Sequence, residues 1–381
     1  MKIGFDGKRA VNNFTGLGNY SRLIIDSLAN RFPSDEFHLY SPSTPDKETT
    51  LFGSNCKNIR HHSPLKPINS FKKSLWRSFG VTQTLSEDKI DLFHGLSNEL
   101  PLNIVSAGIP SIVTIHDLIY RTLPSCYPLP DRLIYNLKYG LSCRNATAII
   151  AISECTKRDI IRFYKVPEDK IHVIYQGCHP DFRPATDKND IETDRSVMLG
   201  RKLHEQYLLQ VGTIETRKNA LLSVRALSAI ENKKIPLILV GKPTPYLNKI
   251  TAEARRLGVA DRLKVLTDVS SAELPSIVRN ASIAIYPSLY EGFGLPVLEA
   301  ISCGVPVIAA KGSCLEEAGG KDSIYIRPDE VSDLKIAIDS LLSNQDLTQK
   351  ITEKGLRYAR NFDHLKSAER IHELYERLLC K

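Results

Sequence analysis

The sequence predicts an α/β protein of two domains, each built on a doubly wound parallel sheet. Three observations carry this prediction. The chain has 381 residues, which is too long for one compact core and suits two. Short runs of β-branched and apolar residues recur along its whole length, each followed by a turn and a longer mixed segment. With 42% hydrophobic and 25% charged residues, the composition is that of a globular protein rather than a disordered or fibrous one.

Each of these apolar runs has the length of a buried strand. In the first half, strands are expected at residues 3–5, 37–40, 91–94, 111–116, 147–152 and 172–175. In the second half, they are expected at residues 207–211, 236–240, 263–266, 282–286, 305–309 and 323–326. Strands that alternate with helical segments form parallel sheets, which bind ligands beyond the carboxyl ends of their strands. We therefore expect the chemistry in a cleft between the two domains.

A charged stretch divides the two halves. It contains Pro180, Pro184 and an acid-rich run over residues 187–194, which is typical of a linker or an exposed excursion. The expected domains are residues 1–180 and 206–360, with the linker over 181–205. Apolar residues at helical spacing near the end predict a final helix within residues 361–381, and we expect it to pack back on the first domain.

Several classes of protein are excluded by composition. The eight cysteines include no Cys-x-x-Cys pair, so neither a zinc cluster nor a disulfide framework is predicted. The longest apolar stretch, residues 146–152, is far shorter than the roughly 20 residues of a spanning helix, and no signal-peptide apolar region begins the sequence. The net charge of +8 suits an anionic ligand or surface but does not predict nucleic-acid binding. We expect a cytoplasmic protein.

A glycine-rich turn follows the first expected strand. Gly16 and Gly18 lie just before a helical run, where backbone amides can approach a phosphate and the helix start favours negative charge. The turn is not a dinucleotide fingerprint, because Ser21 stands where the third glycine should be. A plain structural turn is the alternative interpretation.

A histidine, His116, ends the strand expected at residues 111–116. At the carboxyl end of a strand, an imidazole can hydrogen-bond a ligand hydroxyl or a developing charge. The alternative is a partly buried histidine followed by Asp117 as the cap of the next turn.

Two adjacent cations, Arg217 and Lys218, follow the first strand of the second half in the sequence Gly-Thr-Ile-Glu-Thr-Arg-Lys-Asn. Cations at a strand-to-helix turn suit a diphosphate, because they neutralise the charge that grows as a leaving group departs. A solvated basic turn is the alternative.

The most specific pattern is a pair of carboxylates around a glycine-rich turn. Glu291 and Glu299 are separated by seven residues, and a helix that starts at the turn would carry Glu299 on its second turn. Carboxylates accept paired hydrogen bonds from vicinal hydroxyls, while the amides of the turn can face a phosphate. An exposed ion pair is the alternative for Glu299. The sequence has no Asp-x-Asp, Walker loop or His-Glu-x-x-His, so neither a metal ion nor a cofactor is expected.

Together these four motifs resemble the retaining glycosyltransferases of the GT-B fold, in the family 4, group 1 set of bacterial sugar transferases. That fold implies two Rossmann-like domains facing a cleft, with the acceptor on the first and the nucleotide sugar on the second. The Gly-Thr-x-x-x-Arg-Lys-Asn turn is similar to that of mannosyltransferases in lipopolysaccharide or capsule assembly.

The resemblance implies a metal-independent hexosyltransferase, with GDP-mannose as the first choice of donor. The acceptor would be a glycan or a polyprenyl-diphosphate-linked sugar. The alternatives are a UDP-hexose-dependent transferase, a catalytically silent GT-B subunit that binds a partner, and an epimerase or phosphorylase of the same architecture.

The resemblance also implies roles for single residues. Lys218 with Arg217 would bind the donor diphosphate, Glu291 the sugar hydroxyls and Glu299 the ribose. Many relatives have Arg where this chain has Thr213, and we assign that charge to Arg217. The expected catalytic residues are His116, Lys218 and Glu291. The expected substrate-binding residues are Gly16, Gly18, Arg217, Gly292, Phe293, Gly294, Leu295 and Glu299.

A basic, aromatic segment suggests a membrane contact. Residues 49–86 contain no acid. Phe71, Leu75 and Phe79 are four apart, so a helix there would show an apolar stripe flanked by cations, which suits an anionic leaflet. The cations of the segment are Lys57, Arg60, Lys66, Lys72, Lys73 and Arg77. We expect peripheral contact with the inner membrane, and a core-packed helix with a basic face is the alternative.

Overall fold

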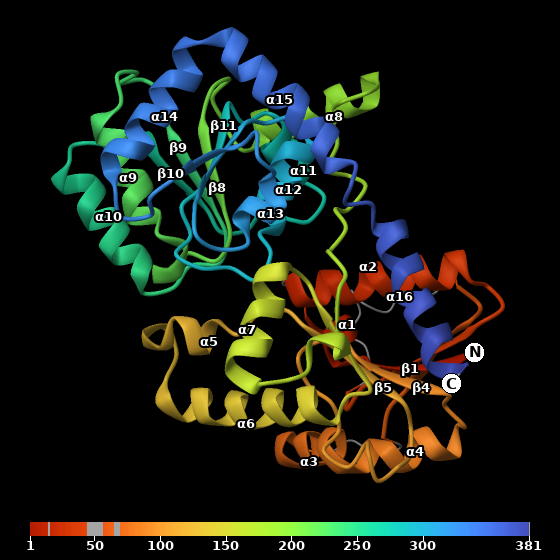
Figure 1. Ribbon diagram of the computed structural model, residues 1–381. Helices are drawn as coiled ribbons and strands as arrows, with labels where there is room; N and C mark the ends of the chain where they lie inside the picture. Colours follow the sequence, from red (N-terminus) through yellow and green to blue (C-terminus); the bar gives the residue numbers. More distant parts are fainter. Residues whose placement is uncertain (14–15, 44–55, 65–68, 381) are drawn as a thin grey trace. The chain divides into compact units, whose positions relative to one another are not determined.

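The computed structural model describes residues 1–13, 16–43, 56–64 and 69–380 (Figure 1). They form two compact units. The first comprises Met1–Gly177 with Phe362–Lys381, and the second comprises Cys178–Asn361. Each unit has its own parallel sheet, so the predicted α/β class with two doubly wound sheets is confirmed.

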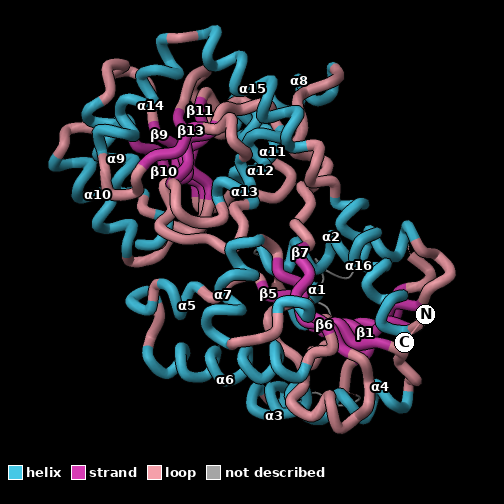
Figure 2. Tube along the Cα trace, viewed as in Figure 1, coloured by secondary structure: helices cyan, strands magenta, loops and turns pink. Residues whose placement is uncertain are grey.

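The first unit is built on a seven-stranded sheet of order β3-β2-β1-β4-β5-β6-β7. Its central strands are near-continuous apolar runs because helices cover both faces of the sheet (Figure 2). The strands are β1 (Lys2–Asp6), β2 (Glu36–Tyr40), β3 (Ile59–His62), β4 (Leu92–Gly95), β5 (Ser111–Ile115), β6 (Ala148–Ala151) and β7 (Ile171–Val173). The helices are α1 (Lys8–Asn12), α2 (Gly16–Arg31), α3 (Ser70–Leu75), a π-helical turn (Trp76–Gly80), α4 (Val81–Glu87), α5 (Ile119–Thr122), α6 (Leu129–Asn145), α7 (Glu154–Tyr164) and α16 (His364–Leu379).

Strand β3 is absent from the sequence prediction. It lies at the edge of the sheet, paired in parallel with β2. Its residues, Ile-Arg-His-His, are half-buried or exposed, so the sequence carries no apolar run there. An edge strand needs only one neighbour, and backbone pairing rather than side-chain burial defines it.

The second unit is built on a six-stranded sheet of order β10-β9-β8-β11-β12-β13, also parallel throughout. All six strands were expected from the sequence. They are β8 (Leu208–Val211), β9 (Leu237–Val240), β10 (Leu263–Leu266), β11 (Ile283–Tyr286), β12 (Val307–Ala310) and β13 (Ile324–Ile326). The helices are α8 (Lys188–Gly200), α9 (Ala220–Ala229), α10 (Tyr246–Arg256), α11 (Leu274–Arg279), α12 (Leu295–Ser302), α13 (Leu315–Gly319), α14 (Val331–Ser343) and α15 (Gln345–Ala359).

The segment over residues 181–205, where the sequence suggests a linker, holds helix α8 inside the second unit. Asp194 of α8 is buried, and its carboxylate pairs with Arg279 of α11, with Nη2 2.8 Å from Oδ1. The same carboxylate accepts a hydrogen bond from Asn280 Nδ2 at 2.9 Å. Asp194, from the acid-rich run, therefore anchors α8 to the rest of the second unit.

The final helix, α16, packs on α2 and belongs to the first unit. Its apolar stripe lies in the same core as residues of α2. Tyr375 Oη lies 2.6 Å from Nδ1 of His94, and His372 Nε2 lies 2.7 Å from an oxygen of Asp35. The stripe consists of Ala368, Ile371, Leu374 and Tyr375, all buried. The chain thus leaves the first unit after Gly177 and returns to it at Phe362.

Within the described residues, no helix combines the length and apolar character that crossing a bilayer requires.

Candidate active site

The candidate site in the second unit lies at the carboxyl ends of two neighbouring strands. Strands β8 and β11 pair in parallel, so the segments that follow them meet at one edge of the sheet. Arg217 and Lys218 lie in a single 3-10 turn, Thr216–Lys218, after β8. Glu291 lies in the loop between β11 and α12. The fold therefore brings together charges that are 73 residues apart in sequence.

Glu291 forms an ion pair with both cations. Its Oε1 lies 2.7 Å from Lys218 Nζ, and its Oε2 lies 2.7 Å from Nη1 of Arg217. Lys218 Nζ also donates to the hydroxyl of Tyr286, the last residue of β11. The three charged side chains are at most 13% exposed, so water screens their charges weakly. We call Arg217, Lys218 and Glu291 the ion-pair cluster.

The ion-pair cluster is fully charged at neutral pH. Burial alone would raise the pKa of Glu291, but the charges of Lys218 and Arg217 lower it to about 2. Burial opposes the charge of Lys218 too, and the attraction of Glu291 nevertheless raises its pKa. Arg217 is additionally paired with Glu215, whose Oε1 lies 2.6 Å from Nη2. With Glu215 counted, two carboxylates balance the two cations in the free protein, so an anionic ligand would take the place of a carboxylate at Arg217 or Lys218.

The backbone that holds these cations is fixed by Asn219, a residue to which the sequence analysis assigned no role. Asn219 has a φ of 59°, in the left-handed region that Asn tolerates better than most residues. Its side-chain nitrogen, Nδ2, donates to the carbonyl oxygens of Pro287 at 3.2 Å and Pro328 at 2.7 Å. Gln210 Nε2 donates to the carbonyl of Lys218 at 2.7 Å. An Asn directly before a helix was the available signal.

Glu299 lies on the second turn of α12, as the sequence predicts. The turn before this helix needs glycine at Gly294, because its φ is 105° and an added Cβ would lie 2.7 Å from Leu315 Cδ2. Phe293 is buried beside it, and Leu295 is the first residue of the helix. The residues Gly292 to Leu295 thus form the short link between Glu291, in the loop, and the helix that carries Glu299.

The two glutamates differ in ionisation. Burial raises the pKa of the Glu299 carboxyl to about 7. Within the described part of the chain, its carboxylate makes no hydrogen bond or ion pair. Glu291 is therefore a permanent anion, whereas Glu299 changes charge near neutral pH.

Two buried hydroxyls at the same edge of the sheet have no hydrogen-bond partner in the part of the chain that the structure describes. Ser288 follows β11, Ser313 follows β12, and the side-chain oxygen of each is buried without a hydrogen bond. A buried hydroxyl without a partner costs free energy, which a ligand oxygen would recover. Neither serine could be predicted as a site residue, since single serines after strands are common.

In the first unit, the glycine-rich turn starts α2. A Cβ on Gly18 would lie 1.8 Å from the carbonyl oxygen of Asn13, so this position requires glycine for backbone packing alone. A Cβ on Gly16 would meet nothing within 4 Å. Backbone packing thus explains Gly18 without a ligand. The open space beside Gly16 would allow a ligand to approach its backbone. Thr15, which precedes them, lies outside the described residues.

His116 follows β5 and is buried against Tyr20 of α2, with an edge-to-face ring contact at 4.7 Å. Its Nε2 donates to the carbonyl of Leu96 at 2.8 Å, and its Nδ1 accepts from Gln176 Nε2 at 3.1 Å. Burial lowers its pKa to about 4, so the imidazole is neutral at pH 7. A ligand that uses either ring nitrogen must replace one of these bonds. The adjacent Asp117 accepts from the amide of Ile119 at 3.1 Å, the capping role considered as the alternative.

One group of side chains in the described residues could hold a metal ion: His38, His62 and Asp88 of the first unit. They already bond to one another. His38 Nδ1 lies 3.0 Å from Nε2 of His62, and His62 Nδ1 lies 3.2 Å from an oxygen of Asp88. His38 and His62 lie on β2 and β3 and Asp88 follows α4, all in the first unit, whereas the ion-pair cluster belongs to the second unit.

Two family models match the chain. One, described as Glycosyltransferase Family 4, matches residues 15–182. The other, described as Glycosyl transferases group 1, matches residues 193–358. The two ranges together cover most of the chain.

Curated relatives and solved structures agree with these matches. The chain is 28% identical to O-antigen chain mannosyltransferase B of Escherichia coli, over 95% of its own length and 96% of that protein. It is 26% identical to O-antigen chain mannosyltransferase RfbU of Salmonella typhimurium, over 67% and 66% of the two proteins. The structure of Anabaena HepE with UDP and glucose covers 99% of both chains with a TM-score of 0.77 at 21% identity. At that identity the structural likeness shows the GT-B fold alone.

Proposed function

Because this chain belongs to the glycosyltransferases, with a family 4 domain followed by a group 1 domain, we propose that it transfers a hexose with retention of configuration. The donor is a nucleotide sugar, bound by the second unit. The acceptor is a glycan or a lipid-linked sugar in the assembly of a cell-surface polysaccharide, bound by the first unit. The observation that carries the proposal is the ion-pair cluster at the carboxyl ends of β8 and β11.

The ion-pair cluster suits the chemistry of a departing diphosphate. When the bond between sugar and diphosphate breaks, negative charge grows on the leaving oxygens and positive charge on the sugar. Arg217 and Lys218 would take up the negative charge, because both cations are buried and already in place. Glu291 would turn from the cations toward the hydroxyls of the donor sugar. No metal ion is then needed at the diphosphate.

The proposed retention does not run through a covalent sugar–enzyme intermediate. A double displacement would require a nucleophile beside the sugar carbon, whereas the proposal has Glu291 bind the hydroxyls of the donor sugar. We propose front-face transfer, in which a leaving phosphate oxygen takes the proton of the acceptor hydroxyl. His116 is neutral and bonded at both ring nitrogens, so its role is to contact the donor sugar and not to carry a proton.

GDP-mannose is the proposed donor, because both curated relatives described above are O-antigen mannosyltransferases. A UDP-hexose is the second candidate. A thermal-shift series with GDP-mannose, UDP-glucose, UDP-galactose and UDP-N-acetylglucosamine would rank them, since a ligand at 100 times its Kd stabilises the folded state by about 2.7 kcal/mol. GDP-mannose should raise Tm the most, and transfer should continue in EDTA. A strict requirement for magnesium or manganese would contradict the proposal.

A catalytically silent subunit is the alternative from another class of protein. The complete ion-pair cluster argues against it, because a buried pair of cations that binds nothing would only cost desolvation free energy. A folded protein that binds none of the four nucleotide sugars would favour the silent subunit. An epimerase would need further catalytic acids, and besides Glu291 and Glu299 the site described above holds only Glu215, which is paired with Arg217.

Donor binding should strengthen as the pH rises toward 7. The ribose hydroxyls need the ionised form of Glu299, whose pKa is about 7 in the free protein. Below pH 7 binding must release a proton, so Kd should fall up to about tenfold per pH unit and level off above the pKa. Isothermal titration with the donor between pH 5.5 and 8.5 measures this slope. Glu299→Gln should flatten the profile, and an unchanged slope in that variant would exclude Glu299 as its source.

We also propose that the first unit contacts the cytoplasmic face of an anionic membrane through α3 and the π-helical turn. Phe71, Leu75 and Phe79 are 77%, 49% and 47% exposed, so they are not part of a core. Lys72 and Lys73 flank them on α3. Exposed apolar residues beside cations favour an anionic leaflet. Lys66 of the same basic segment lies outside the described residues.

The double variant Phe71→Ser with Leu75→Ser should lose most binding to anionic vesicles. The loss follows because each apolar side chain contributes about 1.5–3 kcal/mol when it is fully transferred from water. Sedimentation with vesicles of anionic and of neutral lipid, at low and high salt, measures it. Ile336→Ser is the matched control, since Ile336 is 61% exposed on α14 of the second unit. Equal binding of the unmodified protein to anionic and neutral vesicles would contradict the proposed contact with an anionic membrane.

A further inference from the structure

A cationic cavity of about 360 Å³ opens in the first unit. It is lined by residues that follow β1, β2 and β4 and by residues of α3 and α6. The carboxyl ends of neighbouring parallel strands are where such sheets bind ligands. Its charged lining residues are Lys8, Arg9, Lys73, Arg77, Lys138 and Glu99. Five cations against one carboxylate make the wall strongly positive, which attracts an anion.

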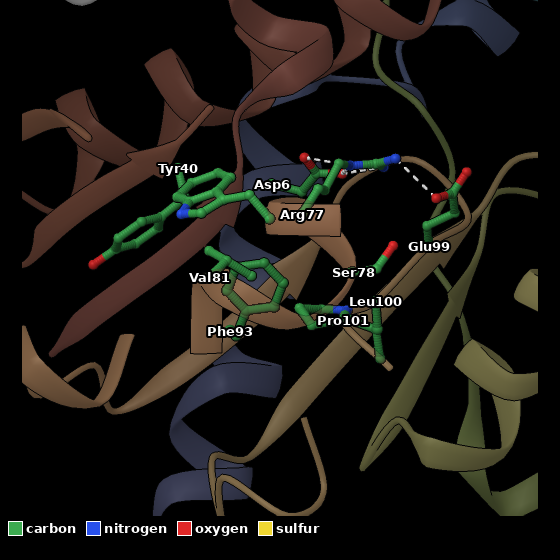
Figure 3. Close-up of a pocket in the computed structure, with 10 residues that line it drawn as sticks. Asp6, Tyr40, Arg77, Ser78, Val81, Phe93, Glu99, Leu100 and Pro101 are labelled. Atoms are coloured by element: carbon green, nitrogen blue, oxygen red, sulfur yellow. Dashed lines mark hydrogen bonds and ion pairs between the residues drawn. The ribbon is translucent and has the colours of Figure 1, made fainter. Parts of the chain in front are cut away.

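Part of this wall is held in place by ion pairs. Arg77 lies between two carboxylates (Figure 3), with its Nη2 2.5 Å from an oxygen of Asp6 and its Nη1 2.8 Å from Oε2 of Glu99. Lys138 Nζ also contacts that Glu99 oxygen, at 3.2 Å. These pairs fix Arg77 and Lys138 before any ligand arrives. In the described residues, the other three cations of the wall, Lys8, Arg9 and Lys73, form no ion pair.

An anion bound in the cavity would pair with Lys8, Arg9 and Lys73. Among the described residues, the buried Nε of Arg9 has no hydrogen-bond partner, which costs free energy. Burial lowers the pKa of Lys8, and the like charges of Arg77 and Arg9 lower it further. A bound phosphate would accept the Nε–H of Arg9 and relieve the repulsion around Lys8.

The helices of this wall are apolar on their outer sides. On α3 and the following turn, the cavity is lined by Ser70, Lys73, Ser74 and Arg77, which are three or four residues apart and share one face. Phe71 and Leu75 lie off that face and are exposed. Helix α6, which supplies Lys138, exposes Leu133 and Leu137, each by 63%. A ligand with an anionic head and a long apolar chain would match both surfaces.

We propose that this cavity binds the diphosphate group of a lipid-linked acceptor, whose apolar chain then lies along the exposed side chains of α3. The inference rests on the proposed function, because it gives the acceptor its chemical class. The donor diphosphate is assigned to Arg217 and Lys218 of the second unit, whereas the residues that line the cationic cavity belong to the first unit. Its position on the first unit suits an acceptor that arrives from a membrane.

Isothermal titration of the whole protein with farnesyl diphosphate tests the cationic cavity. Lys73→Ala should weaken binding about tenfold, the usual loss for one charge-assisted contact to phosphate. Lys72→Ala is the matched control: it removes the same charge from the same helix, but Lys72 is exposed and does not line the cavity. Its effect should stay below about twofold. Arg9→Gln should weaken binding at least as much as Lys73→Ala, and neither variant should change GDP-mannose binding.

These measurements distinguish a lipid-linked diphosphate from a free anion, from the donor and from diffuse surface attraction. Equal losses in Lys72→Ala and Lys73→Ala would show diffuse surface attraction and overturn the site. Inorganic pyrophosphate that binds as tightly as farnesyl diphosphate would overturn the lipid-linked assignment. Lost GDP-mannose affinity in Lys73→Ala would assign the cationic cavity to the donor and overturn the acceptor role. If farnesyl diphosphate binds with the expected variant pattern but no nucleotide sugar binds, the cationic cavity stands and the proposed function fails.

Discussion

Lys218→Ala should lower kcat for sugar transfer by about 100- to 1000-fold, the range seen when one preorganised donor to a developing negative charge is removed. Lys218 is buried and ion-paired with Glu291, so its charge acts through a weakly screening medium. Water admitted by the truncation would be a poor substitute for a fixed ammonium group. Initial rates with the donor identified by thermal shift measure the loss.

The fold should survive this substitution, because Arg217 still neutralises Glu291 through its own 2.7 Å ion pair. Melting curves of the variant establish this point. Lys249→Ala on α10 is the matched control, since it removes an exposed lysine of the same unit and should leave turnover unchanged. Glu291→Ala should also lose transfer, but it leaves two cations facing each other and should lower Tm as well. Near-normal turnover of Lys218→Ala would refute the role of the ion-pair cluster.

Arg77→Met should lower the free energy of unfolding of the first unit by about 3–5 kcal/mol, the cost of leaving a buried charge without its partner. Asp6 is 5% exposed and takes hydrogen bonds from both Nε and Nη2 of Arg77. Methionine keeps the apolar stem but offers Asp6 no donor. Glu99 is less affected because Lys138 still reaches it.

The chain contains a local probe for this measurement. Its single tryptophan, Trp76, precedes Arg77 and lines the small pocket drawn in Figure 3. Urea unfolding followed by tryptophan fluorescence therefore reports on the first unit. Arg31→Met is the control, since the Arg31–Glu369 pair is exposed and should contribute less than about 1 kcal/mol. Equal shifts in both variants would mean that burial of the Arg77 pair has no special effect on stability.

The sheets were largely predictable because their strands are buried on both faces. A strand such as β6, with four buried residues, must be a continuous apolar run, and such a run is visible in the sequence. Strand β3 and helix α8 were not predicted for the opposite reason. Most of their residues are polar and meet water, so their stability comes from backbone pairing and from single contacts such as Asp194 with Arg279.

The candidate site was predictable as a set of motifs but not as a set of contacts. Arg217 and Lys218 were assigned to the donor diphosphate and Glu291 to the sugar hydroxyls, whereas in the free protein Glu291 forms ion pairs with both cations. That pairing depends on β8 and β11 being neighbours, which strand order decides and local sequence does not encode. The cationic cavity was missed for the same reason, because Lys8, Lys73 and Lys138 meet only in the folded unit.

The return of α16 to the first unit has a consequence for the order of synthesis. A ribosome completes the second unit, residues 178–361, before it makes the helix that supplies Ile371, Leu374 and Tyr375 to the core of the first. Until then, the core of the first unit lacks these apolar side chains, whereas the second unit can already fold. Synthesis of α16, rather than emergence of the first 177 residues, is then the event that completes the core of the first unit.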